Sequence, residues 1–448
     1  MRKKIHGNQY RQCPFLRRSC NRPRKGLSLF INQPFSLTPL NNRVILHVNH
    51  QYTCILLEGQ KMYKRNLRLP EKPKQSFFLW GARQTGKTTL LKTCYPDALR
   101  IDLLKTDELM RYAKEPSLLR EEVAALSHER LIVIDEIQKA PVLLDEIHYM
   151  IQEWQRVFAL CGSSARKVRR GHANLLGGRA IRYELFGLVA QELGADFSIE
   201  HFVNTGPLPD HYGAENPALA LRAYVDYYLR EEIMEEGLTR RLPIFSDFLR
   251  VAAIGDTEML NMSNIARETG ISVSTVRDHY GILVDTLMGA FLPAFTLRPK
   301  RRTIQAPKFY FRDLGVVNHL ARRGAIKPGS ELFGKAFENW LFHELSVHAK
   351  YSELFYELSY WRLSSGIEVD FILGPGTVAI EAKGKSKITS GDIRGLVNFK
   401  KDFPEVKWQI IVCLEKRMRK TDEGIHIVPY QEFTKLLWDG KWTQGLYQ

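Results

Sequence analysis

One stretch of the chain, Ser76–Leu90, restricts its fold more than any other. It reads SFFLWGARQTGKTTL and begins with a short apolar run without charge, typical of a strand buried on both faces. The run ends at Gly81, four residues follow, and Gly-Lys-Thr then leads into leucines that predict the start of a helix. A strand, a loop of this spacing and a helix together form a phosphate-binding loop. The stretch therefore predicts an α/β domain built on a P-loop NTPase parallel sheet.

The residue types of this loop suit a bound triphosphate and its metal ion. Glycine lets the loop turn tightly, so that backbone N–H groups point inward at the β-phosphate. Lys87 is expected to reach the β- and γ-phosphates, and the Thr88 hydroxyl to ligate Mg²⁺. A glycine turn with a surface lysine is the alternative, and the full spacing argues against it. We expect ATP and Mg²⁺ as ligands, with nucleotide contacts from Gly81, Ala82, Arg83, Gln84, Thr85, Gly86, Lys87, Thr88 and Thr89.

A second apolar run, Leu131–Glu136, ends in two carboxylates. A hydrophobic strand followed by Asp-Glu is typical of an ATPase. Asp135 is expected to hold Mg²⁺ through water, and Glu136 to polarise the attacking water as general base. The alternative is an acidic pair that caps the following helix. We prefer the catalytic role because a phosphate-binding loop precedes the pair.

A third run, Val157–Ser164, changes from apolar to small polar residues at its end. In a parallel sheet this end lies beside the nucleotide phosphates, so Ser163 or Ser164 is expected to sense the γ-phosphate. In the basic cluster that follows, one arginine could stabilise transition-state charge, in cis or from a neighbouring subunit. A solvated basic surface is an equal alternative for each of its members, which are Arg166, Lys167, Arg169, Arg170 and Arg179.

Length and composition place these motifs in a larger protein. A chain of 448 residues exceeds one compact core, so two to four domains are expected. No apolar run approaches eighteen residues, which argues against a membrane partner. The six cysteines form no CxxC pair, which argues against a zinc site or a disulfide framework and favours a cytoplasmic location.

The net charge of +16 is unevenly distributed. Residues 1–61 hold eleven Lys and Arg residues and one acid, Glu58, and they show no useful helical periodicity. A transit peptide and a basic arm that binds nucleic acid are two readings of such a segment. We favour a third, in which Met62 is the natural start and residues 1–61 are a basic extension without a fold.

Four motifs, taken in order along the chain, resemble those of one known family. GARQTGKTTL, LIVIDEIQ, CGSSARKVRR and LLGGRA are similar to prokaryotic AAA-type ATP-binding proteins with a C-terminal domain of unknown function. The resemblance covers roughly Met62 to the C-terminus and implies a P-loop ATPase core, a helical middle and a nuclease-like C-terminal domain. We therefore assign an AAA-type ATPase domain to 62–193, a helical linker and helix-turn-helix or winged-helix region to 194–329, and the nuclease-like domain to 330–448.

The middle region contains a pattern typical of a helix-turn-helix. Residues 264–272 and then 273–283 have its layout, and Gly270 provides the turn. If the second helix enters a major groove, four side chains face DNA: Ser272, Ser274, Thr275 and Arg277. A packing or protein-binding module is an equal alternative, because the helix carries few basic residues. Four basic residues beyond it could contact phosphates like a wing or form a solvated loop: Arg298, Lys300, Arg301 and Arg302.

The C-terminal region brings two carboxylates and a lysine together. Side chains on a strand alternate between its faces, so Glu381 and Lys383 share one face, and Asp370 on a paired strand can lie beside them. Mg²⁺ and an attacking water could bind there. The pattern resembles the core of PD-(D/E)xK nucleases, a restriction-endonuclease-like α/β fold. The resemblance implies that Asp370 and Glu381 bind metal, that Lys383 orients the nucleophile, and that Glu338 is the upstream acid.

Two functions are compatible with these motifs. The first is an ATP-binding protein and Mg²⁺-dependent ATPase coupled to a DNA-binding, nuclease-like domain. The second is a nucleotide-switched regulator or scaffold, in which an inactive nuclease fold, with Glu381 and Lys383 as a surface ion pair, binds nucleic acid or a protein partner. ATP is the expected ligand in both, and DNA the expected partner in the first. Oligomerisation is left open.

Overall fold

The computed structural model describes residues 62–164, 176–229, 242–296 and 304–446, together with three strands near the N-terminus. It divides into two compact units, Met1–Lys64 and Arg65–Gln448. In the first unit β1 (Ser36–Leu40), β2 (Arg43–Val48) and β3 (Gln51–Tyr52) form an antiparallel sheet, where the sequence suggested no fold. No helix of the described residues is long and apolar enough to cross a membrane.

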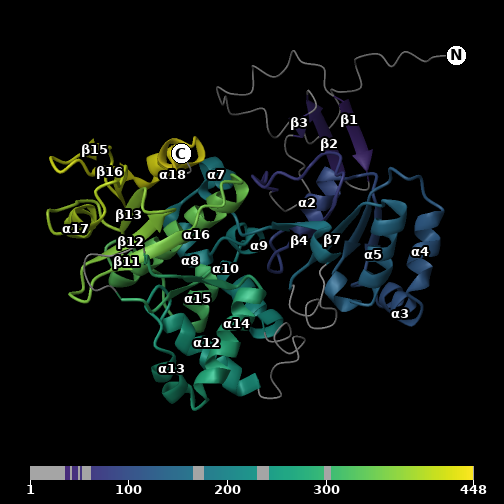
Figure 1. The fold of residues 1–448 in the computed structure, drawn as a ribbon, viewed down its shortest axis with the longest axis horizontal. Coiled ribbons are helices and arrows are strands. Elements are labelled where there is room, and N and C mark those ends of the chain that lie inside the picture. Colours follow the sequence, from purple (N-terminus) through teal and green to yellow (C-terminus); the bar gives the residue numbers. More distant parts are fainter. Residues whose placement is uncertain are drawn as a thin grey trace. The chain divides into compact units, whose positions relative to one another are not determined.

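The second unit begins with a five-stranded parallel sheet of order β5-β6-β7-β4-β8. Figure 1 labels two neighbouring strands of this sheet, β4 and β7. The phosphate loop connects the inner strand β4 to α2, and the chain passes from β5 to β6 and from β6 to β7 through helical crossovers. The elements are β4 (Ser76–Trp80), α2 (Lys87–Cys94), β5 (Leu99–Asp102), α3 (Thr106–Lys114), α4 (Ser117–Ala124), β6 (Ile132–Asp135), a 3-10 turn (Ile137–Lys139), α5 (Leu143–Trp154), β7 (Phe158–Gly162), a 3-10 turn (Leu176–Gly178) and β8 (Ala180–Glu184).

The inner strands β4, β6 and β7 are buried on both faces, as their apolar runs predicted. On one face Phe78 and Trp80 of β4 pack with α3, α4 and α5. On the other face Phe77 and Leu79 pack with α2 and with the last turns of α16 (Glu331–Tyr351), a helix more than two hundred residues further along the chain. The sheet therefore depends on a distant segment for part of its apolar cover.

The middle of the unit is helical, as expected. Tyr224 and Phe248 lie in its core, which agrees with a packing role for these aromatic residues. The helices are α7 (Ala190–Leu193), a 3-10 turn (Gly194–Asp196), α8 (Ile199–Thr205), α9 (Pro209–Tyr212), α10 (Pro217–Ala223), a π-helix (Tyr224–Leu229), α12 (Leu242–Ile254), α13 (Met262–Thr269), α14 (Val273–Asp285) and α15 (Leu314–Leu320), with an antiparallel pair of β9 (Gly289–Leu292) and β10 (Lys308–Phe311).

The C-terminal part is a six-stranded mixed sheet of order β11-β12-β13-β14-β16-β15. Strands β11, β12 and β13 are antiparallel, and β13, β14 and β16 run parallel. The elements are α16, β11 (Leu358–Arg362), β12 (Glu368–Leu373), β13 (Val378–Lys383), α17 (Arg394–Asp402), β14 (Trp408–Cys413), β15 (Arg419–Lys420), β16 (His426–Pro429), α18 (Tyr430–Trp438) and a 3-10 turn (Lys441–Thr443). The structure thus confirms an α/β multidomain chain with a parallel sheet, a helical middle and a C-terminal sheet.

Candidate functional sites

The phosphate loop leaves β4 at Gly81 and enters α2 at Lys87. Gly86 precedes the helix with φ of 90°, a left-handed conformation that glycine adopts without a steric penalty. The Lys87 side chain is buried, and its Nζ donates to the carbonyl oxygens of Gly81 at 2.8 Å and Ala82 at 3.0 Å. The loop therefore wraps around the lysine ammonium, where a phosphate oxygen would compete for the same donor.

Two other predicted residues of this site are in direct contact. Thr88 Oγ1 donates to Asp135 Oδ2 at 2.5 Å, across the gap between α2 and the end of β6. Both groups offer an oxygen atom as a metal ligand, the kind of ligand that Mg²⁺ prefers, so the chemistry of the pair fits a magnesium ion. The structure brings these two predicted metal ligands together.

The residues that follow β6 and β7 are linked by one amide. Glu136 has φ of 58°, in the left-handed region. Gln138 Nε2 donates to the Glu136 carboxylate and, at 3.1 Å, to Ser163 Oγ. Ser163 and Ser164 are both buried at the end of β7. The predicted general base and the predicted γ-phosphate sensor thus share a partner, Gln138, that the sequence did not single out.

The other predicted nucleotide contacts lie along the same loop. Thr85 is buried and its hydroxyl donates to Ala82 O at 2.8 Å, whereas Thr89 is exposed on α2. Arg83 and Gln84, which lie between Ala82 and Thr85 in the loop, are half-buried. Arg179 lies just before β8 at the far edge of the sheet order, and the other members of the basic cluster (Arg166, Lys167, Arg169 and Arg170) lie outside the described residues.

Arg65 is a residue of this site that the sequence analysis missed. Its guanidinium donates to the carbonyl oxygens of Thr85 at 2.6 Å and Phe186 at 2.5 Å, and its Nε lies 3.1 Å from Glu192 Oε1. It therefore ties the phosphate loop to the segment after β8. An isolated arginine in a polar stretch carries no sequence pattern, so only the structure reveals this contact.

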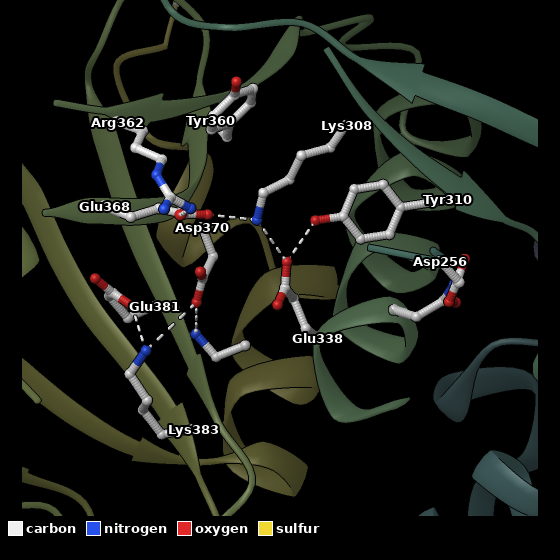
Figure 2. Close-up of polar contacts among 12 residues, drawn as sticks. Asp256, Lys308, Tyr310, Glu338, Tyr360, Arg362, Glu368, Asp370, Glu381 and Lys383 are labelled. Atoms are coloured by element: carbon white, nitrogen blue, oxygen red, sulfur yellow. Dashed lines mark hydrogen bonds and ion pairs between the residues drawn. The ribbon is translucent and has the colours of Figure 1, made fainter. Parts of the chain in front are cut away.

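The predicted acids of the C-terminal region meet in one groove (Figure 2). Its cavity is about 800 Å³ and is lined by side chains of β10, α16, β12, β13 and the start of α17. Six acidic and five basic residues line it: Glu258, Glu338, Glu368, Asp370, Glu381 and Asp392 with Lys308, Lys335, Arg362, Lys383 and Arg394. Because α16 and β10 both contribute, the groove includes residues of the middle region as well as of the C-terminal sheet.

Asp370, Glu381 and Lys383 converge as their strand positions predicted. Lys383 Nζ lies 2.6 Å from Glu381 Oε2 and 3.7 Å from Asp370 Oδ2, and the backbone N–H of Ala382 donates to Asp370 Oδ2 at 2.8 Å. Both carboxylates are buried at the bottom of the groove (Figure 2). They supply two oxygen ligands of the kind that suits a divalent ion.

The environment separates the pKa values of these two acids. Burial raises the pKa of Glu381 well above its ordinary range, and the charge of Asp370 raises it further. Burial is also the largest influence on Asp370, but the charges of Lys383 and Lys308 outweigh it and lower its pKa. Two neighbouring carboxylates with opposite shifts are typical of functional sites and of structural ion-pair networks alike.

Glu338 lies in the groove but has partners that the sequence did not suggest. Its Oε1 accepts from Lys308 Nζ at 3.0 Å and from the Tyr310 hydroxyl at 2.6 Å. Lys308 also forms an ion pair with Glu368, the acid two residues before Asp370 on β12, and the other oxygen of Glu368 lies 2.6 Å from Arg362. The upstream acid is thus engaged by a lysine and a tyrosine of β10.

A wider metal site is absent from the part of the chain that the structure describes. No group of three or more His, Cys, Asp or Glu residues there is placed to hold a metal ion. Asp370 and Glu381 can therefore offer a divalent ion one pair of carboxylates, with water completing the coordination. Glu338 and Glu368 are turned towards Lys308 instead.

The predicted recognition helix corresponds to α14. Gly270 has φ of 68° between α13 and α14, and Ser272 caps α14 by accepting from Thr275 N at 3.1 Å. The Ser272 hydroxyl hydrogen-bonds to the hydroxyls of Ser274 and Thr275, each at 2.8 Å. Arg277 is exposed on the same helix. The basic residues proposed as a wing (Arg298, Lys300, Arg301 and Arg302) lie outside the described residues.

Family comparisons define the class of the first site. Residues 73–194 match a family described as an AAA domain, so the chain contains an AAA-type P-loop NTPase domain, the class of protein that binds nucleotides at such a loop. Residues 198–327 match a Domain of unknown function (DUF8612), and residues 333–433 match a second one (DUF4143). These matches confirm the P-loop expectation and leave the resemblance to nucleases as an expectation.

Individual relatives match this chain at low sequence identity. Uncharacterized proteins of Mycobacterium tuberculosis and Mycobacterium bovis are each 24% identical over 349 residues, which cover 75% of this chain and 76% of theirs. Among solved structures, the replication initiator DnaA bound to AMPPCP and single-stranded DNA is 12% identical and covers 49% of this chain and 84% of that chain. Its TM-score of 0.27 is too low to establish a shared overall fold.

Proposed function

We propose that this chain is a Mg²⁺-dependent ATPase. The contact between Thr88 Oγ1 and Asp135 Oδ2, beside the buried Lys87 ammonium, carries this proposal, because these groups together can hold a nucleotide-bound magnesium ion and a phosphate oxygen. Bound Mg²⁺ would neutralise charge that develops on the phosphates. Thr88 and Asp135 would hold the ion, and Lys87 would hold the β- and γ-phosphates.

The groups after β6 and β7 suit the hydrolytic step. Glu136 follows Asp135 and would accept a proton from a water molecule that attacks the γ-phosphorus. Gln138 bridges Glu136 to Ser163, so the position of the base depends on the residue that would touch the γ-phosphate. The bond between the γ-phosphorus and the bridging oxygen then breaks, and ADP and phosphate are released.

ATP turnover tests this proposal directly. We expect purified full chain to release phosphate from ATP in the presence of Mg²⁺, with a loss of at least about 100-fold in Glu136→Gln and in Lys87→Ala. Lys92→Ala is the matched control, because Lys92 is exposed on the same helix α2. This variant should hydrolyse ATP at the rate of the parent protein. Equal turnover by Lys87→Ala and the parent protein would refute the assignment.

A second candidate activity is Mg²⁺-dependent phosphodiester cleavage in the groove. The convergence of Asp370, Glu381 and Lys383 favours it, because two acids can hold a divalent ion while an ammonium orients a water molecule or stabilises the phosphate. Polynucleotide phosphates are the substrate class that such a charge arrangement suits, and the exposed face of α14 is a candidate contact to DNA. ATP hydrolysis would then reposition these parts on the nucleic acid.

Cleavage of plasmid and single-stranded DNA with Mg²⁺ or Mn²⁺ tests the groove. Lys383→Ala and Asp370→Ala should each abolish cleavage, whereas Lys400→Ala, an exposed lysine of α17, should leave it intact. No cleavage with either metal, together with ATP turnover that Lys87→Ala removes, would favour the nucleotide-switched scaffold instead. Nucleic-acid affinity that falls steeply with salt and is lost in Arg277→Ala would identify α14 as the contact.

A further inference from the structure

The groove contains a lysine that no part of the proposed reaction uses. Lys308 lies on β10, in the middle region, and its ammonium is almost completely buried. Figure 2 shows its Nζ between the carboxylates of Glu338 and Glu368, with the Tyr360 ring alongside at 5.4 Å. A buried ammonium held by two carboxylates occupies the kind of position that a metal ion takes in an acidic site.

The oxygens around Lys308 are already engaged. Glu368 uses one oxygen for Lys308 and the other for Arg362, so neither remains without a cationic partner. Glu338 directs one oxygen at two donors, Lys308 and the Tyr310 hydroxyl. A divalent ion at this end of the groove would have to displace the ammonium from its carboxylates.

At the other end of the groove fewer cations pair with the carboxylates. Asp370 and Glu381 share a single cation, Lys383, which lies close to Glu381 and further from Asp370. When a metal ion binds and all four central carboxylates are ionised, they carry four negative charges against three cationic groups, Lys308, Arg362 and Lys383, so one negative charge is left over. One divalent ion more than neutralises this charge, and a second would enter a site that is already positive.

We propose that Lys308 is a built-in cation of the groove, which takes the place of a second metal ion at Glu338 and Glu368 and restricts the site to one divalent ion at Asp370 and Glu381. The inference rests on the proposed metal-dependent groove and adds its stoichiometry. It also makes the groove a joint product of two segments, because the middle region supplies the cation that positions two acids of the C-terminal part.

Counting bound Mn²⁺ tests the proposal without any catalytic assay. Full-length protein is titrated with Mn²⁺ in the absence of nucleotide, and free ion is measured by electron paramagnetic resonance. Asp135→Asn is present in every protein, the parent included, so that the proposed ion site at Thr88 and Asp135 does not contribute. The parent should bind one ion, which Asp370→Asn removes. Lys308→Met should bind two, whereas Lys308→Arg, which keeps the charge, should bind one.

Two further variants separate the role of Lys308 from general damage. Lys308→Met combined with Glu338→Gln removes an ammonium and a carboxylate together, so it leaves no unpaired charge at Glu338 and should return the count to one. Lys335→Met is the matched control, because Lys335 lines the same groove but pairs with Glu258 and should leave the count at one. A parent that binds two ions or none, or a Lys308→Met variant that gains none, would overturn the proposal.

The same data distinguish the two proposals. A change from one ion to two in Lys308→Met, in a protein that cleaves no DNA, would support the built-in cation and remove the nuclease assignment. Metal-dependent cleavage with no change of count would do the reverse.

Discussion

Glu344 allows a quantitative test of how α16 docks beside the phosphate-binding sheet. Its side chain is fully buried, and its Oε1 accepts a hydrogen bond from Ala190 N at 2.6 Å, just after β8. Burial raises the pKa of Glu344 to about 8, so the folded protein keeps this carboxyl protonated at neutral pH. In the unfolded chain an ordinary glutamate loses its proton near pH 4.

The sign of the pH dependence follows from these two values. Between about pH 4 and 8 the folded state retains a proton that the unfolded state has lost, so the free energy of unfolding decreases as pH rises. From pH 6 to pH 9 this decrease amounts to about 3 kcal/mol, because each unit of pKa difference is worth about 1.4 kcal/mol. Glu344→Gln removes this dependence and keeps an oxygen that can accept from Ala190 N.

Thermal unfolding at pH 6 and pH 9 measures the effect. Relative to the parent protein, Glu344→Gln should gain roughly 5 °C in Tm between the two pH values, and other buried acids cancel because both proteins contain them. Glu331→Gln, at the exposed first residue of α16, should follow the parent profile. Identical pH profiles for Glu344→Gln and the parent would refute the reasoning.

Three further changes should have measurable effects. Gly81→Ala would place a Cβ 2.5 Å from the Leu185 carbonyl oxygen. The loop would have to shift, so a fluorescent ATP analogue should bind at least about tenfold more weakly. Unchanged affinity would contradict the tight packing of the loop. Gly395→Ala would make a methyl group overlap with the Glu368 carbonyl oxygen and the Glu381 side chain, so cleavage should be lost while ATP turnover persists. Burial lowers the pKa of His343 to about 3, below its unfolded value near 6.5, so stability present above pH 6.5 is lost on acidification, by about 2 kcal/mol at pH 5. A stable His343→Gln variant whose Tm changes between pH 7 and pH 5 as much as that of the parent would contradict this cause.

Local patterns were enough to predict much of the nucleotide site. The loop spacing placed Lys87 and Thr88 at the start of a helix, and the apolar run before Asp135 placed this acid at the end of a strand of the same sheet, β6. In a parallel sheet such strand ends meet at one edge, so the contact between Thr88 and Asp135 follows from the topology. Strand alternation likewise brought Glu381 and Lys383 to one face.

The surroundings of these residues could not be predicted in this way. Lys308 and Tyr310 reach Glu338 because β10 lies beside α16, and nothing local to either segment encodes this neighbour. One signal was present: a lysine in the apolar strand Lys308–Phe311 needs an acidic partner once the strand is buried. The identity of the partner, however, depends on tertiary packing, and the same holds for Arg65 and its three carbonyl and carboxylate contacts.

We do not expect the segment that matches the AAA domain to fold independently of the rest of the chain. The match ends at residue 194, yet Phe77 and Leu79 of β4 are covered by Val347 and Tyr351 of α16, and Tyr351 also accepts a hydrogen bond from Phe186 N at 3.0 Å. A fragment of residues 62–194 would expose this face of the sheet, and a large exposed apolar surface promotes association. We expect the fragment to aggregate or to melt well below residues 62–448, as measured by size-exclusion chromatography and thermal unfolding. A monomeric fragment with the same Tm as the longer chain would show that α16 contributes nothing to the stability of the nucleotide-binding sheet.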